Sequence, residues 1–490
     1  MTRAARTAAP GEAVGRVALA GPGVAAEVAP VLAARGLPAE VGDDDPAVLI
    51  AAVARGVAAV AWAAAEPVDA ATALRLAAVG RAAAEAGRPL VALAPPVRGT
   101  GKATIERAAA LAHLRAAGAV VVADPDVWLE AIVLVGAIGV PRGPRVAVVA
   151  PPGSWLERAG AALSAEAEEA GRRGPSVSSG AEEGDPVDAV LVDRAALERA
   201  GRSARALVVA VAARAELLLP DDPPMLVGLR PALAAVAACG RAAERIAVGV
   251  GPAPVAARDE LEIDEARVER QLGKTGAGDR RLGDHEAKVL LAAYGVPITR
   301  QAVATTPSAA VRVAKKAGYP VEVKPWGPDV PSERAGCPVE RGVATASDVR
   351  RAFLAVLGAA GMPVAEAEGA AVIVRETPPS GREVAALVQR VGALGWAVVV
   401  EVAGAGTPLA APAPLRVADA TQLAAAVTST RAGEPEPDRI ALANVLRRVS
   451  HLAVDLEARI ERVELGRIVV GARGARTMVV DAAVELREAD

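Results

Sequence analysis

The sequence contains few aromatic residues, cysteines and histidines. Phe, Trp and Tyr make up 2% of the 490 residues although 52% are hydrophobic, so the cores must be built from Ala, Val and Leu. The two cysteines, Cys239 and Cys337, lie far apart and offer no disulfide framework. The three histidines, His113, His285 and His451, are too widely spaced to form a metal-ligand motif.

Neither sign of charge is in large excess. The net charge is −3 and the two signs are interspersed, which argues against nucleic acid or an anionic membrane as a partner. The uncharged runs near 56–65 and 131–140 are about half as long as a spanning helix. Residues 1–16 contain no hydrophobic segment typical of a secretory signal. We therefore expect a cytoplasmic protein.

The first half predicts a parallel α/β architecture, because short apolar strands alternate with segments of helical length. We expect strands near 17–20, 60–64, 89–94 and 119–123, and helices at 24–35, 69–87, 103–118 and 127–139. A second unit of the same kind has expected strands at 145–149, 189–192 and 207–210. Its polar segment 171–185 is predicted to be a loop.

Two helices are predicted at the start of the second half. Asp284 and Thr306 are suited to the N-cap positions. Gly295 and Gly318 are suited to the left-handed position that follows each helix. The charged segment 259–280 before them is expected to be a linker.

A short strand follows these helices. Val321 and Val323 share one face of it, so Glu322 and Lys324 share the other. A lysine on the face opposite the core is suited to bind phosphate oxygens. Five of the six lysines fall within residues 274–324, which supports a specific role for an ammonium group there. The Gly-Lys-Thr at 273–275 is not a P-loop, because Val268 replaces the required glycine.

This order of elements resembles the start of the ATP-grasp domain in ADP-forming acyl-CoA synthetases, relatives of succinyl-CoA ligase. The matching segments are Glu286-Ala287-Lys288, Tyr294-Gly295-Val296-Pro297, Gly318-Tyr319-Pro320-Val321 with Lys324, and Gly327-Pro328-Asp329-Val330-Pro331. Segments 88–93, 114–120 and 184–188 resemble the flavodoxin-like CoA-ligase domains of the same family. The resemblance implies an α/β fold with a flexible N-terminus at 1–14, flavodoxin-like domains with parallel sheets at 15–142 and 143–258, the linker at 259–280 and an ATP-grasp domain at 281–490.

The resemblance also implies site residues and ligands. Lys324, Arg375, Glu376 and Glu383 match nucleotide-binding positions of the family, and Asp481 matches a metal ligand. The implied cofactors are ATP and Mg²⁺, and the implied further ligand is CoA or an acyl-CoA.

Several residues depart from the family pattern. Gly99 stands at the position of the phosphohistidine, and His113 in the next helix is not placed to replace it. Imidazole suits a phosphoryl relay because its nitrogen is nucleophilic at neutral pH. Ile468 stands at a metal-binding Asn, and Glu333 stands where a cation normally faces phosphate. Both changes weaken the binding of MgATP, because Mg²⁺ requires oxygen ligands and like charges repel.

Two other residues have structural interpretations. Cys337 is interpreted as a small loop residue in preference to a reactive thiol. His451 lies off the apolar stripe formed by Leu442, Leu446 and Val449 on a predicted helix.

Three hypotheses follow. In the first and favoured one, the chain is a degenerate family member that binds a nucleotide or CoA ester and acts as a regulatory or scaffold subunit. In the second, it is an active acyl-CoA synthetase completed by a partner subunit, because the resemblance does not extend to the family's Rossmann-type CoA-binding domain. In the third, it is an ATP-grasp carboxylate ligase with a non-CoA acceptor. An oligomer is expected in the family. No catalytic residue is assigned.

Overall fold

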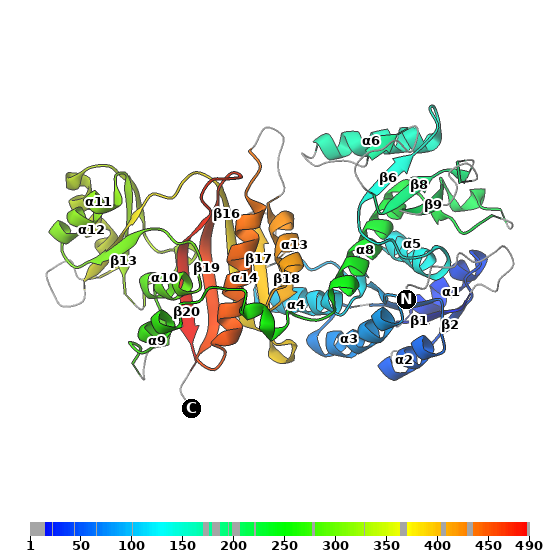
Figure 1. Ribbon diagram of the computed structural model, residues 1–490, viewed down its shortest axis with the longest axis horizontal. Coiled ribbons are helices and arrows are strands. Elements are labelled where there is room, and N and C mark those ends of the chain that lie inside the picture. Colours follow the sequence, from blue (N-terminus) through cyan, green and yellow to red (C-terminus); the bar gives the residue numbers. More distant parts are fainter. Residues whose placement is uncertain are drawn as a thin grey trace. The chain divides into compact units, whose positions relative to one another are not determined.

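The computed structural model describes residues 15–487 except 22, 44, 65, 100, 170–175, 179–186, 195, 198–205, 220–221, 277–279, 328, 363–369, 403–407 and 429–434. The chain forms two compact units (Figure 1). Unit 1 comprises residues 1–97 and 110–251, and unit 2 comprises residues 98–109 and 252–490. The predicted α/β class is confirmed.

Unit 1 begins with a parallel sheet in the order β2-β1-β3-β4-β5. Its strands are β1 (Val17–Ala20), β2 (Ala39–Val41), β3 (Ala59–Ala63), β4 (Val91–Leu93) and β5 (Val120–Val122). The helices are α1 (Val24–Ala34), α2 (Pro46–Ala54), α3 (Ala70–Glu85), α4 (Lys102–Ala116) and α5 (Pro125–Val133), the last continued by η1 (Leu134–Ile138). Residues 102–109 of α4 belong to unit 2. Asp45, Asp69 and Asp124 cap α2, α3 and α5 by accepting hydrogen bonds from backbone N–H groups.

A second parallel sheet in unit 1 has the order β10-β9-β8-β6-β7. It contains β6 (Val146–Val149), β7 (Ser176–Ser178), β8 (Ala189–Val192), β9 (Leu207–Ala212) and β10 (Leu226–Val227), with α6 (Trp155–Glu169), η2 (Ala215–Leu217) and α8 (Leu229–Val248). The prediction of a loop at 171–185 is wrong at β7, where a short polar segment pairs with β6 as the edge strand. The rest of that segment lies outside the described residues.

A buried ion pair connects the two sheets of unit 1. Arg35, directly after α1, binds Glu130 on α5 through both of its terminal nitrogens, at 2.5 and 3.0 Å. Glu130 also accepts a hydrogen bond from the N–H of Val227 on β10, at 2.9 Å. Arg35 donates to the carbonyl of Met225, at 2.6 Å. Both charged side chains are almost fully buried.

Unit 2 contains two antiparallel sheets. The larger sheet has the order β11-β20-β19-β16-β17-β18, with β11 (Arg281–Leu282), β16 (Arg382–Arg390), β17 (Trp396–Val402), β18 (Leu409–Pro412), β19 (Ile460–Val470) and β20 (Met478–Leu486). The smaller sheet has the order β12-β15-β13-β14, with β12 (Gln301–Ala304), β13 (Val321–Trp326), β14 (Glu340–Val343) and β15 (Ala371–Glu376). The short helices η3 (Val255–Arg258), η4 (Glu333–Ala335) and η5 (Gly392–Leu394) lie in connecting segments.

Helices cover the apolar side of each sheet in unit 2. The core of the larger sheet includes side chains from α9 (Glu265–Leu272), α10 (Asp284–Ala293), α13 (Val417–Val427) and α14 (Arg439–Asp455). The segment 259–280, predicted as a linker, thus contains a helix, α9, whose Val268 and Leu272 pack in this core. The core of the smaller sheet includes side chains from α11 (Pro307–Ala317) and α12 (Ala346–Ala359).

The helix-end predictions at the start of unit 2 are confirmed at Thr306 and Gly295. Thr306 caps α11 by accepting from the N–H of Ala309, at 3.1 Å. Gly295 follows the C-cap residue Tyr294 and has a φ angle of 69°, a region in which glycine has no steric penalty. Gly318 also has a positive φ, of 91°, but it is itself the C-cap of α11, and its ψ of 132° lies outside the left-handed helical region. The prediction that Asp284 is an N-cap is wrong. Gly283 occupies the cap, and Asp284 is the first helical residue.

None of the helices among the described residues combines the length and apolar character needed to cross a bilayer.

Candidate functional site

Strand β13 presents a charged face toward the larger sheet. The predicted division of its side chains is confirmed, because Val321 and Val323 pack against α11 and α12 in the core of the smaller sheet. Glu322 and Lys324 lie on the opposite face and are 2% and 1% exposed. The charges on β13 are therefore buried, and partners within the chain must compensate them.

Lys324 contacts three carboxylates of this chain. Its Nζ lies 2.6 Å from Oδ1 of Asp481 on β20, 3.5 Å from Asp284 on α10 and 3.9 Å from Glu333 on η4. Burial lowers the pKa of Lys324, but Asp284 and Asp481 more than offset this effect and hold that pKa above its ordinary value. The lysine is therefore a cation that is already paired.

Asp481 is completely buried, and both of its oxygens have partners. Oδ1 accepts from Lys324, and Oδ2 accepts from the backbone N–H of Glu333 at 3.0 Å. The second contact depends on Gly466, the nearby residue of β19. A Cβ atom at position 466 would lie 2.4 Å from Oδ2 of Asp481. The lack of a side chain at Gly466 therefore leaves room for the carboxylate in its observed position.

Arg375 on β15 is fully buried beside Glu322, its partner in the β13–β15 ladder. Its Nη2 lies 2.5 Å from Oε2 of Glu322 and 2.5 Å from Oε1 of Glu333. Its Nη1 donates to the carbonyl of Val480 at 2.7 Å. Burial opposes its charge, but Glu333 and Glu322 raise the pKa of Arg375 above its ordinary value. Every terminal nitrogen of this guanidinium is used within the chain.

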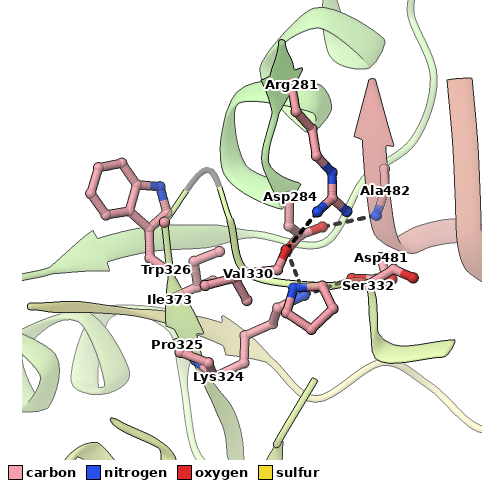
Figure 2. Close-up of a pocket in the computed structure, with 12 residues that line it drawn as sticks. Arg281, Asp284, Lys324, Pro325, Trp326, Val330, Ser332, Ile373, Asp481 and Ala482 are labelled. Carbon is pink, nitrogen blue, oxygen red and sulfur yellow. Dashed lines mark hydrogen bonds and ion pairs between the residues drawn. The ribbon is translucent and has the colours of Figure 1, made fainter. Parts of the chain in front are cut away.

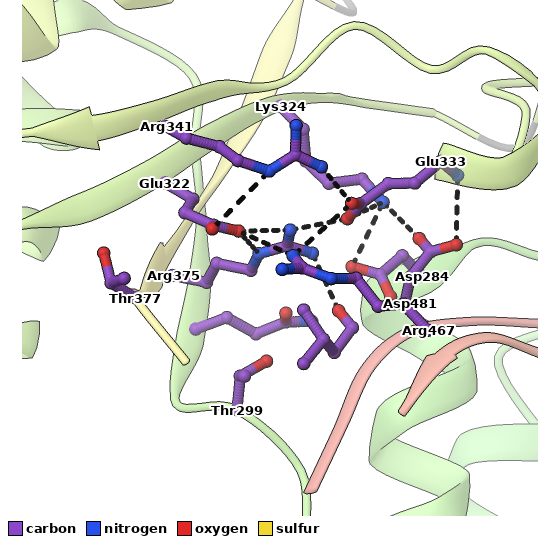
Figure 3. A network of polar contacts seen from close by, with 12 residues as sticks. Asp284, Thr299, Glu322, Lys324, Glu333, Arg341, Arg375, Thr377, Arg467 and Asp481 are labelled. Atoms are coloured by element: carbon purple, nitrogen blue, oxygen red, sulfur yellow. Dashed lines mark hydrogen bonds and ion pairs between the residues drawn. The ribbon is translucent and has the colours of Figure 1, made fainter. Parts of the chain in front are cut away.

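Glu333 lies among four cations (Figure 3). Besides Arg375 and Lys324, it contacts Arg341 on β14, at 2.8 Å, and Arg467 on β19, at 3.8 Å. Burial would raise the pKa of Glu333, but Arg375 and Lys324 hold it below the ordinary value. Ion pairs within the chain therefore stabilise this carboxylate as an anion.

A second buried lysine, Lys288, pairs with Asp284, which is also a partner of Lys324. Lys288 on α10 is fully buried, and its Nζ lies 3.1 Å from Oδ1 of Asp284 and donates to Thr299 at 3.1 Å and Gln301 at 2.8 Å. It also donates to the carbonyl of Val480. Burial lowers the pKa of Lys288 to about 8. The register of β19 and β20 shifts by one residue at this point, so the bulge turns a backbone carbonyl toward two cations.

Ion pairs join these residues into one network, which we call the charged cluster. It contains five basic and five acidic side chains: Lys288, Lys324, Arg341, Arg375, Arg467, Asp284, Glu322, Glu333, Glu383 and Asp481. Their formal charges cancel. Sequence reasoning missed Asp284 as a member, although its spacing of four residues from Lys288 on one helix is the signal for such a pair.

The remaining predicted site residues lie in different surroundings. Glu376 contacts Arg300 at 2.8 Å and Arg476 at 3.1 Å, outside the charged cluster. Glu383 is about half exposed and pairs with Arg467 at 2.7 Å. Ile468 is fully buried in the apolar core of the larger sheet, and its correspondence to the family's metal-binding Asn stays a prediction. Arg467 is the register partner of Asp481 on β19, and the backbone of Gly466 lies beside the Asp481 carboxylate.

Gly99 lies in the segment before α4 with a φ angle of 96°, and a Cβ atom there would be 3.6 Å from Oγ1 of Thr104. The correspondence of Gly99 to the family's phosphohistidine stays a prediction, as do the nucleotide-binding roles of Lys324, Arg375, Glu376 and Glu383.

A small pocket opens beside the charged cluster (Figure 2). Arg281, Asp284, Lys324, Trp326 and Asp481 are among the residues that line it. The pocket is small and lies directly against the ion pair of Lys324 and Asp481.

The residues present do not fit a Mg²⁺ ion. Mg²⁺ needs several oxygen ligands in near-octahedral geometry. Both oxygens of Asp481 are engaged, and Gly466 offers no side chain. Within the described part of the chain, no three His, Cys, Asp or Glu side chains converge in a way that could hold a metal.

Neither cysteine provides a reactive thiolate. Both are buried and free. Burial raises the pKa of Cys337 to about 11 and that of Cys239 to about 12. These values agree with the interpretation of Cys337 as a small loop residue.

Comparisons with known proteins assign the second half of the chain. Residues 274–486 match the family described as ATP-grasp domain. The chain is 26% identical over 220 residues to the beta subunit of the ADP-forming acetate–CoA ligase II of Pyrococcus furiosus, and the match covers 43% of this chain and 93% of the relative. This part of the chain is therefore an ATP-grasp domain that is similar to the beta subunits of ADP-forming acetate–CoA ligases.

Other relatives are more distant. The ADP-forming 4-hydroxybutyrate–CoA ligase of Nitrosopumilus maritimus is 21% identical over 238 residues, covering 46% of this chain and 34% of the relative. Among solved structures, PH1788 of Pyrococcus horikoshii gives a TM-score of 0.41 at 23% identity, covering 46% of this chain and 100% of that one. The apo acetyl-coenzyme A synthetase 1 of Ca. Korarchaeum cryptofilum gives 0.38 at 24% identity, covering 45% and 100%.

Proposed function

We propose that this family member does not transfer phosphoryl groups, and that it serves as a non-catalytic, regulatory or scaffold subunit that binds a nucleotide or CoA ester. The observation that carries the proposal is the pairing of Lys324. The cation expected to bind phosphate lies 2.6 Å from Asp481, the carboxylate expected to bind metal. Asp481 thus lies where a phosphate would contact Lys324, and Lys324 lies where a metal ion would contact Asp481.

The charge balance of the charged cluster supports the proposal. The phosphate chain of ATP is strongly anionic, and a site for it needs an excess of positive charge or a bound cation. Here five acidic side chains neutralise five basic ones, and most of the pairs are buried. Binding MgATP would require these pairs to separate, and an uncompensated buried charge costs several kcal/mol.

Labelling with γ-³²P-ATP and Mg²⁺ tests the proposal directly. We expect no phosphorylated residue and no ADP release by the purified chain, whereas an active ADP-forming acetate–CoA ligase run in parallel gives both. A labelled residue in this chain, located by mass spectrometry, would contradict the proposal.

A second candidate function is that of an active synthetase completed by a partner. The observation that favours it is that two relatives, both from Pyrococcus furiosus, carry the names of beta subunits of acetate–CoA ligases. Such names imply a second type of subunit, which would supply the phosphohistidine and the CoA-binding domain. Affinity purification of the tagged chain from its native cells, followed by an assay for acyl-CoA formation, distinguishes the two. CoA-ester formation that requires this chain and also requires ATP would establish the second function.

A further inference from the structure

The loop after β13 places a carboxylate where the charged cluster is richest in cations. Oε1 of Glu333 lies 2.5 Å from Arg375 and 3.9 Å from Lys324. Oε2 lies 2.8 Å from Arg341 and 3.8 Å from Arg467. The four cations come from β13, β14, β15 and β19 and converge on one side chain that is only 7% exposed (Figure 3).

This convergence has the properties of an anion site. Arg and Lys side chains that surround two oxygens from several directions are the usual donors to phosphate groups. The oxygens in this case belong to the chain itself. Resting on the proposed function, we propose that Glu333 is an internal competitor that fills a polyphosphate site, and that removing its carboxylate opens this site to a polyphosphate anion without Mg²⁺.

Contacts outside the cations hold the loop in place. Ser332 donates to Glu464 at 2.9 Å, and the backbone N–H of Cys337 donates to the carbonyl of Ser332 at 3.1 Å. Arg334 binds Glu401. The loop is therefore fastened on both sides of Glu333, so its carboxylate does not need the cations alone to stay in position.

The hydrogen bond from the backbone N–H of Glu333 to Asp481 explains why the variant is expected to bind a polyphosphate anion without Mg²⁺. This hydrogen bond does not involve the Glu333 side chain, so it remains when Glu333 is replaced by Gln or Ala. Lys324 still holds the other oxygen of Asp481. In a variant without the Glu333 carboxylate, the charged cluster therefore gains one net positive charge, whereas Asp481 stays engaged and offers Mg²⁺ no free oxygen.

Titration calorimetry with sodium tripolyphosphate, in EDTA and at constant ionic strength, tests the proposal on the full-length chain. We expect Glu333→Gln and Glu333→Ala to bind at least about tenfold more tightly than the wild type. Glu340→Ala removes the same charge from an exposed position on β14 and is expected to bind like the wild type. Adding Arg341→Ala to Glu333→Ala is expected to reduce the gain.

The outcomes are separable. Equal binding by the wild type and both Glu333 variants, or no binding by a folded Glu333→Gln variant, would overturn the proposal. Circular dichroism establishes whether each variant is folded. Glu333→Gln keeps the size of the side chain and remains testable if Glu333→Ala unfolds. Phosphoryl transfer by the wild type would overturn the proposed function instead, and the comparison of tripolyphosphate affinities does not depend on that result.

Discussion

At the scale of single residues, the absence of a side chain at Gly466 determines the position of Asp481 in the charged cluster. Gly466 leaves space for Asp481 to reach the N–H of Glu333. Ile468, which was matched to the family's metal-binding Asn, packs in an apolar core, and that correspondence stays a prediction. The sequence did not indicate that Gly466 faces the Asp481 carboxylate, because side-chain direction near a bulge does not follow strict alternation along a strand.

Gly466→Ala tests this role. The new Cβ would lie 2.4 Å from Asp481, which displaces a buried carboxylate from its hydrogen bond. We expect a loss of about 1–3 kcal/mol in the free energy of unfolding, measured by urea denaturation. Gly358→Ala is the matched control, because a Cβ there meets no atom within 4 Å and lies on the exposed side of α12. That change is expected to be neutral or stabilising by up to about 1 kcal/mol, and an equal loss in both variants would refute the role.

His451 provides a prediction about pH. It lies off the apolar stripe in the sequence, yet it is only 2% exposed and its Nε2 has no hydrogen-bond partner. Burial lowers its pKa below the ordinary value of 6.5, with Asp455 opposing and Arg447 and Arg258 adding to the effect. As pH falls through 6.5, the unfolded chain therefore takes up this proton before the folded one, and stability decreases.

We expect the free energy of unfolding to decrease between pH 7.5 and pH 5.5 by less in His451→Leu than in the wild type. His113 and His285 have pKa values lowered by burial as well, so some dependence on pH remains in the variant. Identical pH profiles of the two proteins would show that His451 does not contribute.

At the scale of elements, apolar runs in unit 1 predicted the central strands and the edge strand β5, but they missed the edge strands β2 and β7. The strands β1, β3 and β4 are fully buried, which is why their sequences are continuously apolar. The edge strand β2 is partly exposed, and the edge strand β7 is Ser-Val-Ser, so neither has an apolar signature. Edge strands pair on one side only, and their sequences are correspondingly less constrained.

The packing of helix α8 gives a prediction at this scale. Gly240 is buried in the middle of α8, where a Cβ atom would lie 2.1 Å from the carbonyl oxygen of Gly143. The helix therefore approaches that backbone more closely than any side chain permits. Gly240→Ala is expected to cost at least about 1–3 kcal/mol despite the higher helix propensity of alanine. Urea denaturation beside Gly358→Ala measures it, and a stabilised Gly240→Ala variant would disprove the close approach.

At the scale of the whole molecule, the charged cluster shows the limit of sequence reasoning. Local patterns located Lys324, its strand and the two helices before it. The partners of Lys324 come from α10, η4 and β20. No local pattern joins residues so far apart in the chain, and only the resemblance to the family suggested that Lys324 and Asp481 share a site. Only the folded structure shows that Lys324 and Asp481 neutralise each other.

In unit 1, Arg35 and Glu130 are also charged partners that lie far apart in the sequence. Their ion pair joins helices of the first sheet to β10 of the second. Glu130→Ala leaves Arg35 buried without its counter-charge, so we expect a loss of about 3–5 kcal/mol in the free energy of unfolding. The double variant Arg35→Met with Glu130→Leu removes both charges and should cost less than Glu130→Ala alone. Guanidinium denaturation of the three proteins measures both effects. A double variant that is less stable than Glu130→Ala would show that the pair itself, and not the avoidance of an unpaired charge, stabilises unit 1.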